Sequence, residues 1–250
     1  MKMHAGVYWS AGVGHEKNQD SLSLQQASLQ RGECLLAVVC DGIGSLQAAE
    51  DAGSIVVSHL TDWFYHEGKE LICHNRSKEK ILLALQGQIF QIQESLQRFQ
   101  QKEHIQTGTT CSGILLTKRN YYLIHIGDCR IYLIRRTKNP FLKKQYHMQC
   151  LTKDDQDKRG HLFKALGLAG SDRAVFEAGK LRRHTGFLIC TDGFYRQQKK
   201  EVMEQILGPL ILNSDSRLKD QIERRLEMLG SLAAQQGSRD DMSAIGIVVR

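Results

Sequence analysis

The sequence LLAVVCDGIG at Leu35–Gly44 is an apolar run that ends abruptly in Asp41-Gly42. A short apolar run bounded by a turn signal is typical of a fully buried strand, and Asp-Gly is a strong turn signal. We therefore expect one carboxylate at the end of a buried strand. The glycine beside it would allow the backbone to come close to a ligand.

The same design recurs further along the chain. IHIGD at Ile124–Asp128 and GFLICTDG at Gly186–Gly193 also end apolar runs in an aspartate beside a glycine. Asp240-Asp241 precedes the last apolar segment, and Asp20 precedes an early one. We expect the rest of the chain to be a scaffold that brings these strand ends together.

Composition and length favour one globular domain over residues 1–250. Of the 250 residues, 41% are hydrophobic and 24% charged, and there are only two prolines. No apolar stretch approaches the roughly 20 residues that span a membrane. The seven cysteines show no C-x-x-C spacing, which is typical of thiols in a reducing compartment. The sequence therefore predicts a cytoplasmic protein.

The net charge of +7 leaves alternatives open. A basic face could bind nucleic acid or an anionic membrane, but the cations are scattered. The basic clusters are only doublets: Arg135-Arg136, Lys143-Lys144, Arg182-Arg183 and Lys199-Lys200. A basic surface that attracts acidic, phosphorylated substrates fits equally well, and we expect neither a nucleic-acid nor a membrane partner.

Hydrophobic periodicity predicts the main elements. Strands are expected at 3–10, 21–26, 111–117, 121–126, 130–135, 148–151, 187–191 and 243–249. Helices are expected at 48–64, 77–102, 197–207 and 216–236, with Ser77 as an N-cap. The first two helices would form an antiparallel pair on one side of a sheet. The strands between 111 and 135 would form an antiparallel meander.

Three connections carry further expectations. The polar segment at 12–20 is either a hairpin loop or a loop of the functional site. The segment at 137–147 is predicted to be a loop. The segment at about 152–183 has little predicted structure, and long connections of this kind are usually functional, so we interpret it as a flap beside the site.

Aspartates at strand ends are hard oxygen ligands. Carboxylates clustered without paired histidines or cysteines suit Mg²⁺ or Mn²⁺ rather than zinc. Two such ions about 3.5–4 Å apart form a common site for phosphate-ester hydrolysis. Each Asp-Gly pair alone is more often a turn, so the prediction depends on their joint order.

Seven short motifs, spread in order over nearly the whole chain, resemble those of the metal-dependent protein serine/threonine phosphatases of type 2C in their compact bacterial form. The motifs are Asn18-Gln19-Asp20-Ser21, Asp41-Gly42-Ile43-Gly44, Gly108-Thr109-Thr110, Gly127-Asp128-Cys129-Arg130, Ala165-Leu166-Gly167, Thr191-Asp192-Gly193 and Asp240-Asp241-Met242-Ser243. The resemblance implies an α+β fold: a four-layer α-β-β-α sandwich whose two mainly antiparallel sheets are flanked by helices.

The resemblance also implies a metal site with two divalent ions, Mn²⁺ or Mg²⁺. Asp41 would bridge them, and the Gly42 carbonyl would bind one. Asp192 and Asp241 would complete the ligands of the first ion. Asp128 matches the position of a third, more weakly bound ion in bacterial members.

Other positions carry the remaining expectations. Asp20 would hold metal-bound water. His15 stands where the family usually has a phosphate-gripping arginine, and it is our candidate for substrate binding. Gln19 stands where some members have a metal-binding glutamate, and Leu46 and Ala49 replace the usual His and Gly. If His15 does not bind the phosphate, Lys17 or Arg130 could do so.

Two functions of different classes follow. One is a metal-dependent phosphatase that hydrolyses phosphoserine and phosphothreonine in proteins, with a metal-activated water as the attacking group. The alternative is a pseudophosphatase that binds phosphoproteins without turnover. The presence of Asp41, Asp192 and Asp241 favours the enzyme. The expected partners are phosphorylated proteins, targets of a serine/threonine kinase, and a monomer is expected.

Overall fold

The computed structural model describes residues 1–13, 15, 17–30, 32–137, 145–168 and 174–250. Contacts divide the chain into two compact units that are each built from separate segments. Unit 1 contains Met1–Asn18, Arg130–Lys153 and Arg182–Arg250, and unit 2 contains Gln19–Cys129 and Asp154–Leu181. The prediction that residues 1–250 form one domain stays a prediction.

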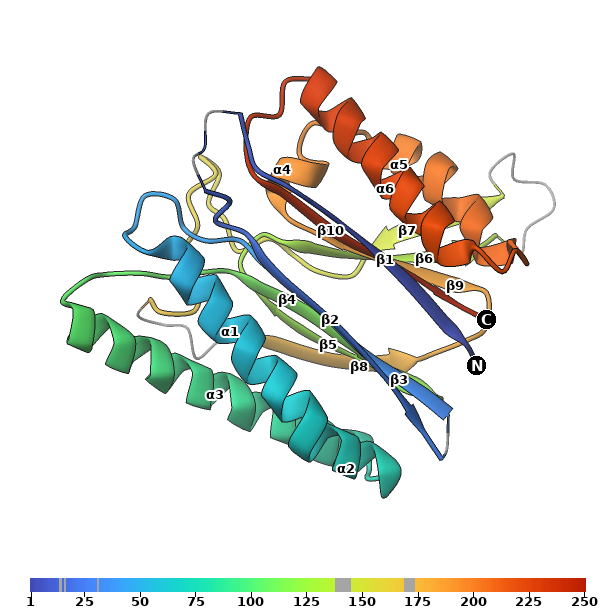
Figure 1. The fold of residues 1–250 in the computed structure, drawn as a ribbon, viewed down its shortest axis with the longest axis horizontal. Helices are drawn as coiled ribbons and strands as arrows, with labels where there is room; N and C mark the ends of the chain where they lie inside the picture. Colours follow the sequence, from blue (N-terminus) through green and yellow to red (C-terminus); the bar gives the residue numbers. More distant parts are fainter. Residues whose placement is uncertain (14, 16, 31, 138–144, 169–173) are drawn as a thin grey trace. The chain divides into compact units, whose positions relative to one another are not determined.

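Unit 1 is a five-stranded antiparallel sheet with helices on one face (Figure 1). The strands are β1 (Met3–Ser10), β6 (Arg130–Arg136), β7 (Tyr146–Cys150), β9 (Thr185–Cys190) and β10 (Met242–Val249), in the order β1-β10-β9-β6-β7. The helices are α4 (Asp192–Tyr195), α5 (Lys200–Leu207), the 3₁₀ helix η3 (Gly208–Leu212) and α6 (Leu218–Gln235).

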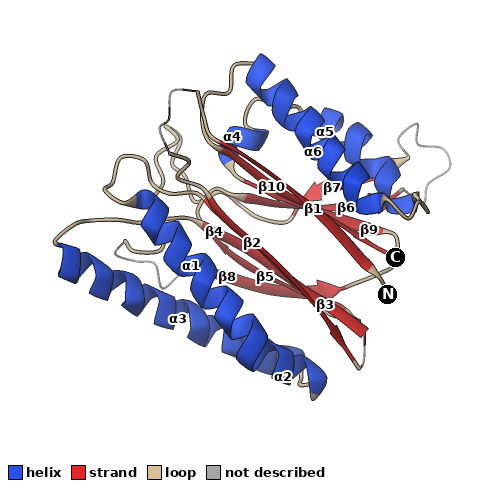
Figure 2. Ribbon diagram, in the orientation of Figure 1, coloured by secondary structure: helices blue, strands red, loops and turns tan. Residues whose placement is uncertain are grey.

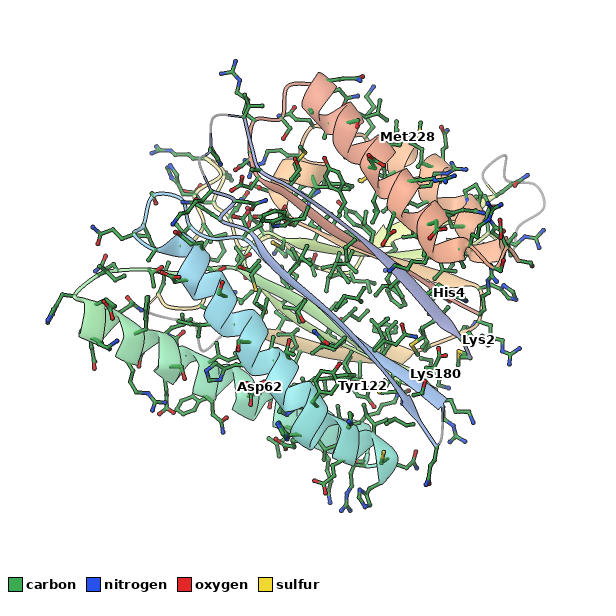
Figure 3. All side chains as sticks on the ribbon, in the orientation of Figure 1. Lys2, His4, Asp62, Tyr122, Lys180 and Met228 are labelled. Atoms are coloured by element: carbon green, nitrogen blue, oxygen red, sulfur yellow. The ribbon has the colours of Figure 1, made fainter. Side chains whose placement is uncertain are left out.

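The core of unit 1 lies between α6 and the sheet. The buried stripe of α6 is Leu218, Ile222, Leu226, Leu229 and Ala233, which recur at helical spacing. Met228, on the opposite face of α6, is half exposed (Figure 3). The predicted helix at 216–236 is therefore confirmed. The chain ends lie side by side because β1 pairs with β10, and Lys2 and Arg250 exchange two backbone hydrogen bonds.

Unit 2 is a second five-stranded antiparallel sheet with its own helical layer (Figure 2). The strands are β2 (Ser21–Leu29), β3 (Gly32–Cys40), β4 (Cys111–Leu116), β5 (Asn120–Ile126) and β8 (Val175–Lys180), in the order β2-β3-β4-β5-β8. The helices are α1 (Ala49–Trp63), the π-helix η1 (Phe64–Gly68), α2 (Lys69–Cys73) and α3 (Lys78–Glu103). The predicted α+β class with two antiparallel sheets flanked by helices is confirmed.

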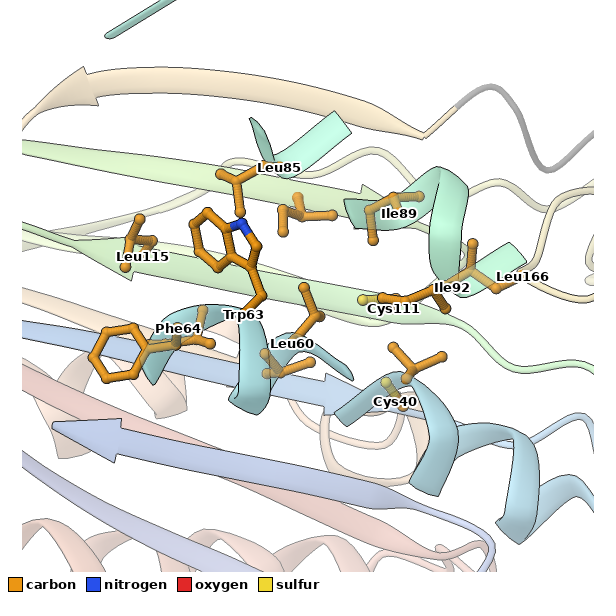
Figure 4. Close-up of a cluster of buried hydrophobic side chains, with 14 of the residues drawn as sticks. Cys40, Leu60, Trp63, Phe64, Leu85, Ile89, Ile92, Cys111, Leu115 and Leu166 are labelled. Carbon is orange, nitrogen blue, oxygen red and sulfur yellow. The ribbon is translucent and has the colours of Figure 1, made fainter. Parts of the chain in front are cut away.

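The core of unit 2 lies between its sheet and the pair α1 and α3, as the sequence predicts. Trp63 of α1 and Phe64 of η1 belong to the same buried cluster as Leu85 and Ile92 of α3 and Leu115 of β4 (Figure 4). The hydroxyl oxygen of Ser77 accepts a hydrogen bond from the backbone N–H of Lys80, which confirms the predicted N-cap of α3.

The predicted meander at 111–135 is wrong in its last strand. β4 and β5 pair as expected, but β6 pairs with β7 and β9 in the sheet of unit 1. The free edge of β5 pairs instead with β8, which lies about 50 positions later in the chain. Local periodicity indicates that a segment is a strand, but it does not identify the strand with which that segment pairs. Gly127 turns the chain between β5 and β6 with a φ of +108°.

Two loops also differ from expectation. β1 and β2 lie in different sheets, so the segment at 12–20 is not a hairpin loop. The predicted flap contains β8, and Leu166 exchanges two backbone hydrogen bonds with Thr109. Residues 169–173 of the flap and 138–144 of the predicted loop at 137–147 lie outside the described residues. No helix in the described part of the chain is long and apolar enough to cross a membrane.

Candidate active site

One group of predicted site residues lies where neighbouring strands of the unit 1 sheet begin or end. Because β10 runs antiparallel to both neighbours, its first residues lie beside the last residues of β1 and β9. Ser10 is paired with Met242, and Cys190 with Ala244. The segments that flank these strands carry His15, Asp192, Asp240 and Asp241.

Asp241 is buried and hydrogen bonded to the loop that follows β1. Its Oδ1 atom accepts a hydrogen bond from the backbone N–H of Gly12 at 2.7 Å and lies 3.1 Å from His15 Nδ1. A Cβ atom on Gly12 would lie 2.3 Å from the carbonyl oxygen of Arg239, so this position requires glycine. The structure thus brings His15 and Asp241 together.

Asp192 and Asp240 contribute two further carboxylates to this group. Asp192 Oδ2 lies 2.5 Å from Arg196 Nη2, whereas Asp192 Oδ1 is buried without a hydrogen-bond partner in the described part of the chain. Partial burial raises the pKa of Asp240, and the neighbouring charges of Asp192 and Asp241 raise it further. Neighbouring carboxylates that raise each other's pKa are suited to a hard divalent cation.

Gly193 makes the close approach of these segments possible. A Cβ atom at this position would lie 2.1 Å from the carbonyl oxygen of Asp241 and 2.9 Å from Cβ of Asp240. The glycine of the Thr191-Asp192-Gly193 motif therefore has a packing role within unit 1.

A cavity of about 340 Å³ opens beside this group. Its lining includes His15, Arg196, Gln197, Ser238, Arg239 and Asp240. Two arginines and a histidine thus lie beside a single lining carboxylate. We call this cavity the arginine cavity.

A second group of predicted residues lies where neighbouring strands of the unit 2 sheet begin or end. Ser21 is paired with Cys40, and Cys111 with Ile126, so Asp20, Asp41 and Asp128 flank neighbouring strand ends. Burial raises the pKa of the Cys129 thiol, and the charges of these three carboxylates raise it further. The three aspartates therefore share one electrostatic environment.

The Gly108-Thr109-Thr110 motif holds the backbone of Asp41. The Asp41 N–H donates to Thr110 Oγ1 at 2.8 Å, and the Asp41 carbonyl oxygen accepts from the Thr110 N–H and the Thr109 hydroxyl, each at 2.9 Å. A Cβ atom on Gly42 would lie 2.8 Å from the carbonyl oxygen of Gln19. The turn that ends β3 is therefore fixed by two threonines that lie far away in the sequence.

Asp155 ties the start of the predicted flap to the turn that carries Asp128. Its N–H donates to the Gly127 carbonyl oxygen at 2.8 Å, and its Oδ2 atom accepts from the Gly127 N–H at 3.1 Å. Lys164 Nζ lies 2.7 Å from Asp155 Oδ1, and the Gln156 side chain donates to Asp128. The sequence analysis did not single out Asp155, since its role depends on a contact with Gly127.

The structure therefore places the predicted residues in two groups, one in each unit. Unit 1 holds His15, Asp192 and Asp241; unit 2 holds Asp20, Asp41, Gly42 and Asp128. Within the described residues, no group of three or more His, Cys, Asp or Glu side chains is arranged to hold a metal ion. The assignments of metal ligands and of His15 stay predictions. None of the cysteines, all of which lie in the described residues, forms a disulfide, and most are buried.

Asp240 and Arg196 are candidate residues that sequence reasoning did not assign. The signal for Asp240 was the Asp240-Asp241 pair itself, but the pattern does not say which of the two carboxylates lines a cavity. In the structure Asp241 is hydrogen bonded to the loop after β1, whereas Asp240 lines the arginine cavity. Arg196 carries no pattern beyond its spacing of four residues from Asp192 on one helical turn.

Three solved structures of bacterial serine/threonine phosphatases share this fold. The Staphylococcus aureus enzyme is 19% identical, with a TM-score of 0.78 over 100% of this chain and 96% of its own. The S. agalactiae enzyme is 17% identical, with a TM-score of 0.77 over 100% of both chains. The Mycobacterium tuberculosis enzyme is 20% identical, with a TM-score of 0.74 over 99% of both chains.

The fold of this chain is thus the one seen in solved structures of bacterial serine/threonine phosphatases. The family model for protein phosphatase 2C matches residues 12–229, which include both groups of carboxylates. The chain belongs to the protein phosphatase 2C family.

Proposed function

We propose that this protein hydrolyses phosphoserine and phosphothreonine in proteins and depends on Mn²⁺ or Mg²⁺. The observation that carries the proposal is the pair Asp192 and Asp240. One carboxylate has a buried oxygen without a partner in the described residues, and the other has a raised pKa. A divalent cation would relieve both features.

The donor atoms proposed here are carboxylate and carbonyl oxygens, the ligand type that such ions prefer. Asp41, the Gly42 carbonyl, Asp192 and one carboxylate of the Asp240-Asp241 pair are the proposed ligands, and Asp128 is proposed to hold a third, weaker ion. Asp241 Oδ1 accepts from Gly12 and faces His15, whereas Asp240 accepts from the neighbouring Asp241 N–H and lines the cavity, so we favour Asp240 within the pair. When bound, two ions supply an activated water and neutralise charge on the phosphoryl oxygens.

The chain's own residues would orient this chemistry. Asp20 is proposed to hold a water molecule as a hydrogen-bond acceptor. His15 is proposed to contact the substrate through the ring nitrogen that does not face Asp241. Thr109 and Thr110 hold the backbone of Asp41, the residue proposed to bind both ions.

The function can be tested with an aryl phosphate and a phosphothreonine peptide. Each is incubated with the protein in Mn²⁺, in Mg²⁺ and in chelator. Hydrolysis of both substrates with either metal, and none with chelator, is expected. Undiminished turnover after thorough chelation would overturn metal dependence.

The second candidate, a pseudophosphatase, would bind the phosphopeptide without hydrolysing it under any metal condition. The Asp192 Oδ1 atom, which is buried without a hydrogen-bond partner in the described residues, favours the enzyme, because burying a polar atom without a partner is costly unless a ligand such as a cation satisfies it. We propose phosphorylated targets of a serine/threonine kinase as partners. We also propose a monomeric, cytoplasmic state, which fits the unpaired cysteines.

A further inference from the structure

The arginine cavity lies beside the proposed metal ligands of unit 1. It has a volume of about 340 Å³, and Asp240 contributes to its lining. Asp192, the other proposed ligand, contacts Arg196 of the same lining at 2.5 Å. A group bound in this cavity would therefore lie next to the carboxylates that are proposed to hold an ion.

The two arginines of the lining can accept an anion. The Arg196 side chain is about half exposed at 51%, and its Nη2 atom lies 2.5 Å from Asp192 Oδ2. A guanidinium carries five N–H donors, so it can bind more than one acceptor at a time. The backbone of Arg239 is held by a 3.0 Å hydrogen bond from the Val13 N–H to its carbonyl oxygen. The side chain of Arg239 makes no hydrogen bond or ion pair within the described part of the chain.

The other candidate cations are less suited to this task. His15 faces Asp241 at 3.1 Å. Arg130 stacks on the Tyr195 ring at 3.9 Å and donates to the Tyr132 hydroxyl. Lys17 is not part of the cavity lining. Of the cations considered, Arg196 and Arg239 are the two permanent charges that line the cavity.

We propose that the arginine cavity is an anion-binding subsite for the phosphate group of the substrate, with Arg196 and Arg239 as its phosphate-binding side chains. The inference rests on the proposed function and names the residues that bind its substrate. A phosphate monoester carries up to two negative charges. It therefore matches two guanidinium groups better than a ligand with a single carboxylate would. Arginine donors are also arranged to hold two phosphate oxygens at once.

The experiment measures peptide binding by calorimetry on metal-free protein, so it does not depend on turnover. Three versions of one peptide are compared, with phosphothreonine, glutamate or threonine at the central position. Wild type should bind the phosphothreonine peptide at least about tenfold more tightly than the glutamate peptide, because its second charge adds a charge-assisted interaction.

Variants assign the effect to the cavity. Arg196→Gln and Arg239→Gln should each weaken binding of the phosphothreonine peptide about tenfold, and Arg196→Lys should weaken it less. Arg183→Gln is the matched control, because Arg183 is an exposed arginine of unit 1 outside the cavity lining. Arg196→Gln also removes the partner of Asp192, so Arg239→Gln is the variant that tests binding without that loss.

Two results would overturn the inference. One is equal binding of the phosphothreonine peptide by Arg239→Gln, Arg196→Gln and Arg183→Gln. The other is equal affinity of wild type for the phosphothreonine and glutamate peptides, which would indicate a site for any acidic group. Aryl phosphate hydrolysis by the metal-loaded wild type separates the two proposals. If the two arginine variants weaken peptide binding but the wild type hydrolyses nothing, only the proposed function is contradicted. If the wild type hydrolyses the aryl phosphate but the two arginine variants bind the peptide like wild type, only the inference is contradicted.

Discussion

Asp241 accepts a 2.7 Å hydrogen bond from the backbone N–H of Gly12, a residue 229 positions earlier in the chain. The bond joins the loop after β1 to the segment before β10. Its acceptor is a carboxylate that the family resemblance predicts to be a metal ligand. The neighbouring Asp240 lines the arginine cavity instead. Two adjacent acids of the same type thus have different environments.

Asp240→Asn is expected to lower turnover by more than about 100-fold, since even residues that only support a metal ligand often cost about 10–100-fold. Asp241→Asn keeps an oxygen that can accept from Gly12, so we expect a smaller loss. Turnover and the metal-induced rise in melting temperature are measured for both variants. The reverse order of effects would support Asp241 as the ligand.

Asp192→Asn should abolish turnover and the metal-induced rise in melting temperature while the metal-free protein stays folded. The substitution keeps the size of the side chain, and it removes one of the negative charges that raise the pKa of Asp240. Circular dichroism checks the fold, and thermal melts with and without Mn²⁺ check binding. A metal-induced shift equal to that of wild type would exclude Asp192 as a ligand.

Asp155→Ala is expected to destabilise the protein by roughly 2–4 kcal/mol, because it leaves Lys164 without its partner and Gly127 without an acceptor. Asp155→Asn should cost less, since an amide oxygen can still accept from Gly127. Denaturant unfolding of Asp155→Asn, Lys164→Met and the double variant gives the coupling energy, expected at about 1–2 kcal/mol. Additive effects would mean that the ion pair contributes nothing.

Asp215→Asn is expected to lower the melting temperature at neutral pH but not in acid. The Arg217 N–H donates to Asp215, and this bond lowers the pKa of the Asp215 carboxyl. A lowered pKa means that the stabilisation is present above the unfolded-state pKa and is lost as the pH falls through the folded-state value. Melts of both proteins between pH 7 and about pH 3 should converge at the acid end.

The control for Asp215 is Glu227→Gln, which replaces an exposed carboxylate on α6. It should melt like wild type across the same range. If the melting temperatures of Asp215→Asn and wild type differed by the same amount at every pH, the substitution would not act through the charge of the carboxylate.

Gly87→Ala should stabilise the protein by about 0.5–1 kcal/mol, because alanine is the better helix former. A Cβ atom at Gly87 of α3 meets nothing within 4 Å in the described structure. Gly53→Ala in α1 is the matched comparison, since its Cβ would lie 2.7 Å from Ser21 Oγ. Denaturant unfolding should show opposite signs for the two variants.

Most secondary structure was predictable because its signals are local. The apolar stripes of α1, α3 and α6 and the N-cap at Ser77 depend on residues within a few positions of one another. Apolar runs that end in Asp-Gly likewise placed Asp41 and Asp192 at strand ends. Element boundaries differed by a few residues, and β8 was missed within the predicted flap.

The sequence by itself determined most of the strands and helices, and it placed the aspartates at strand ends, since periodicity and turn chemistry act over short distances. The tertiary structure decided which sheet receives β6, which acid of the Asp240-Asp241 pair is hydrogen bonded to Gly12, and which cations line the arginine cavity. These outcomes depend on partners up to 229 positions apart. Chemically similar strands, acids and arginines are distinguished only by the contacts that the folded chain allows.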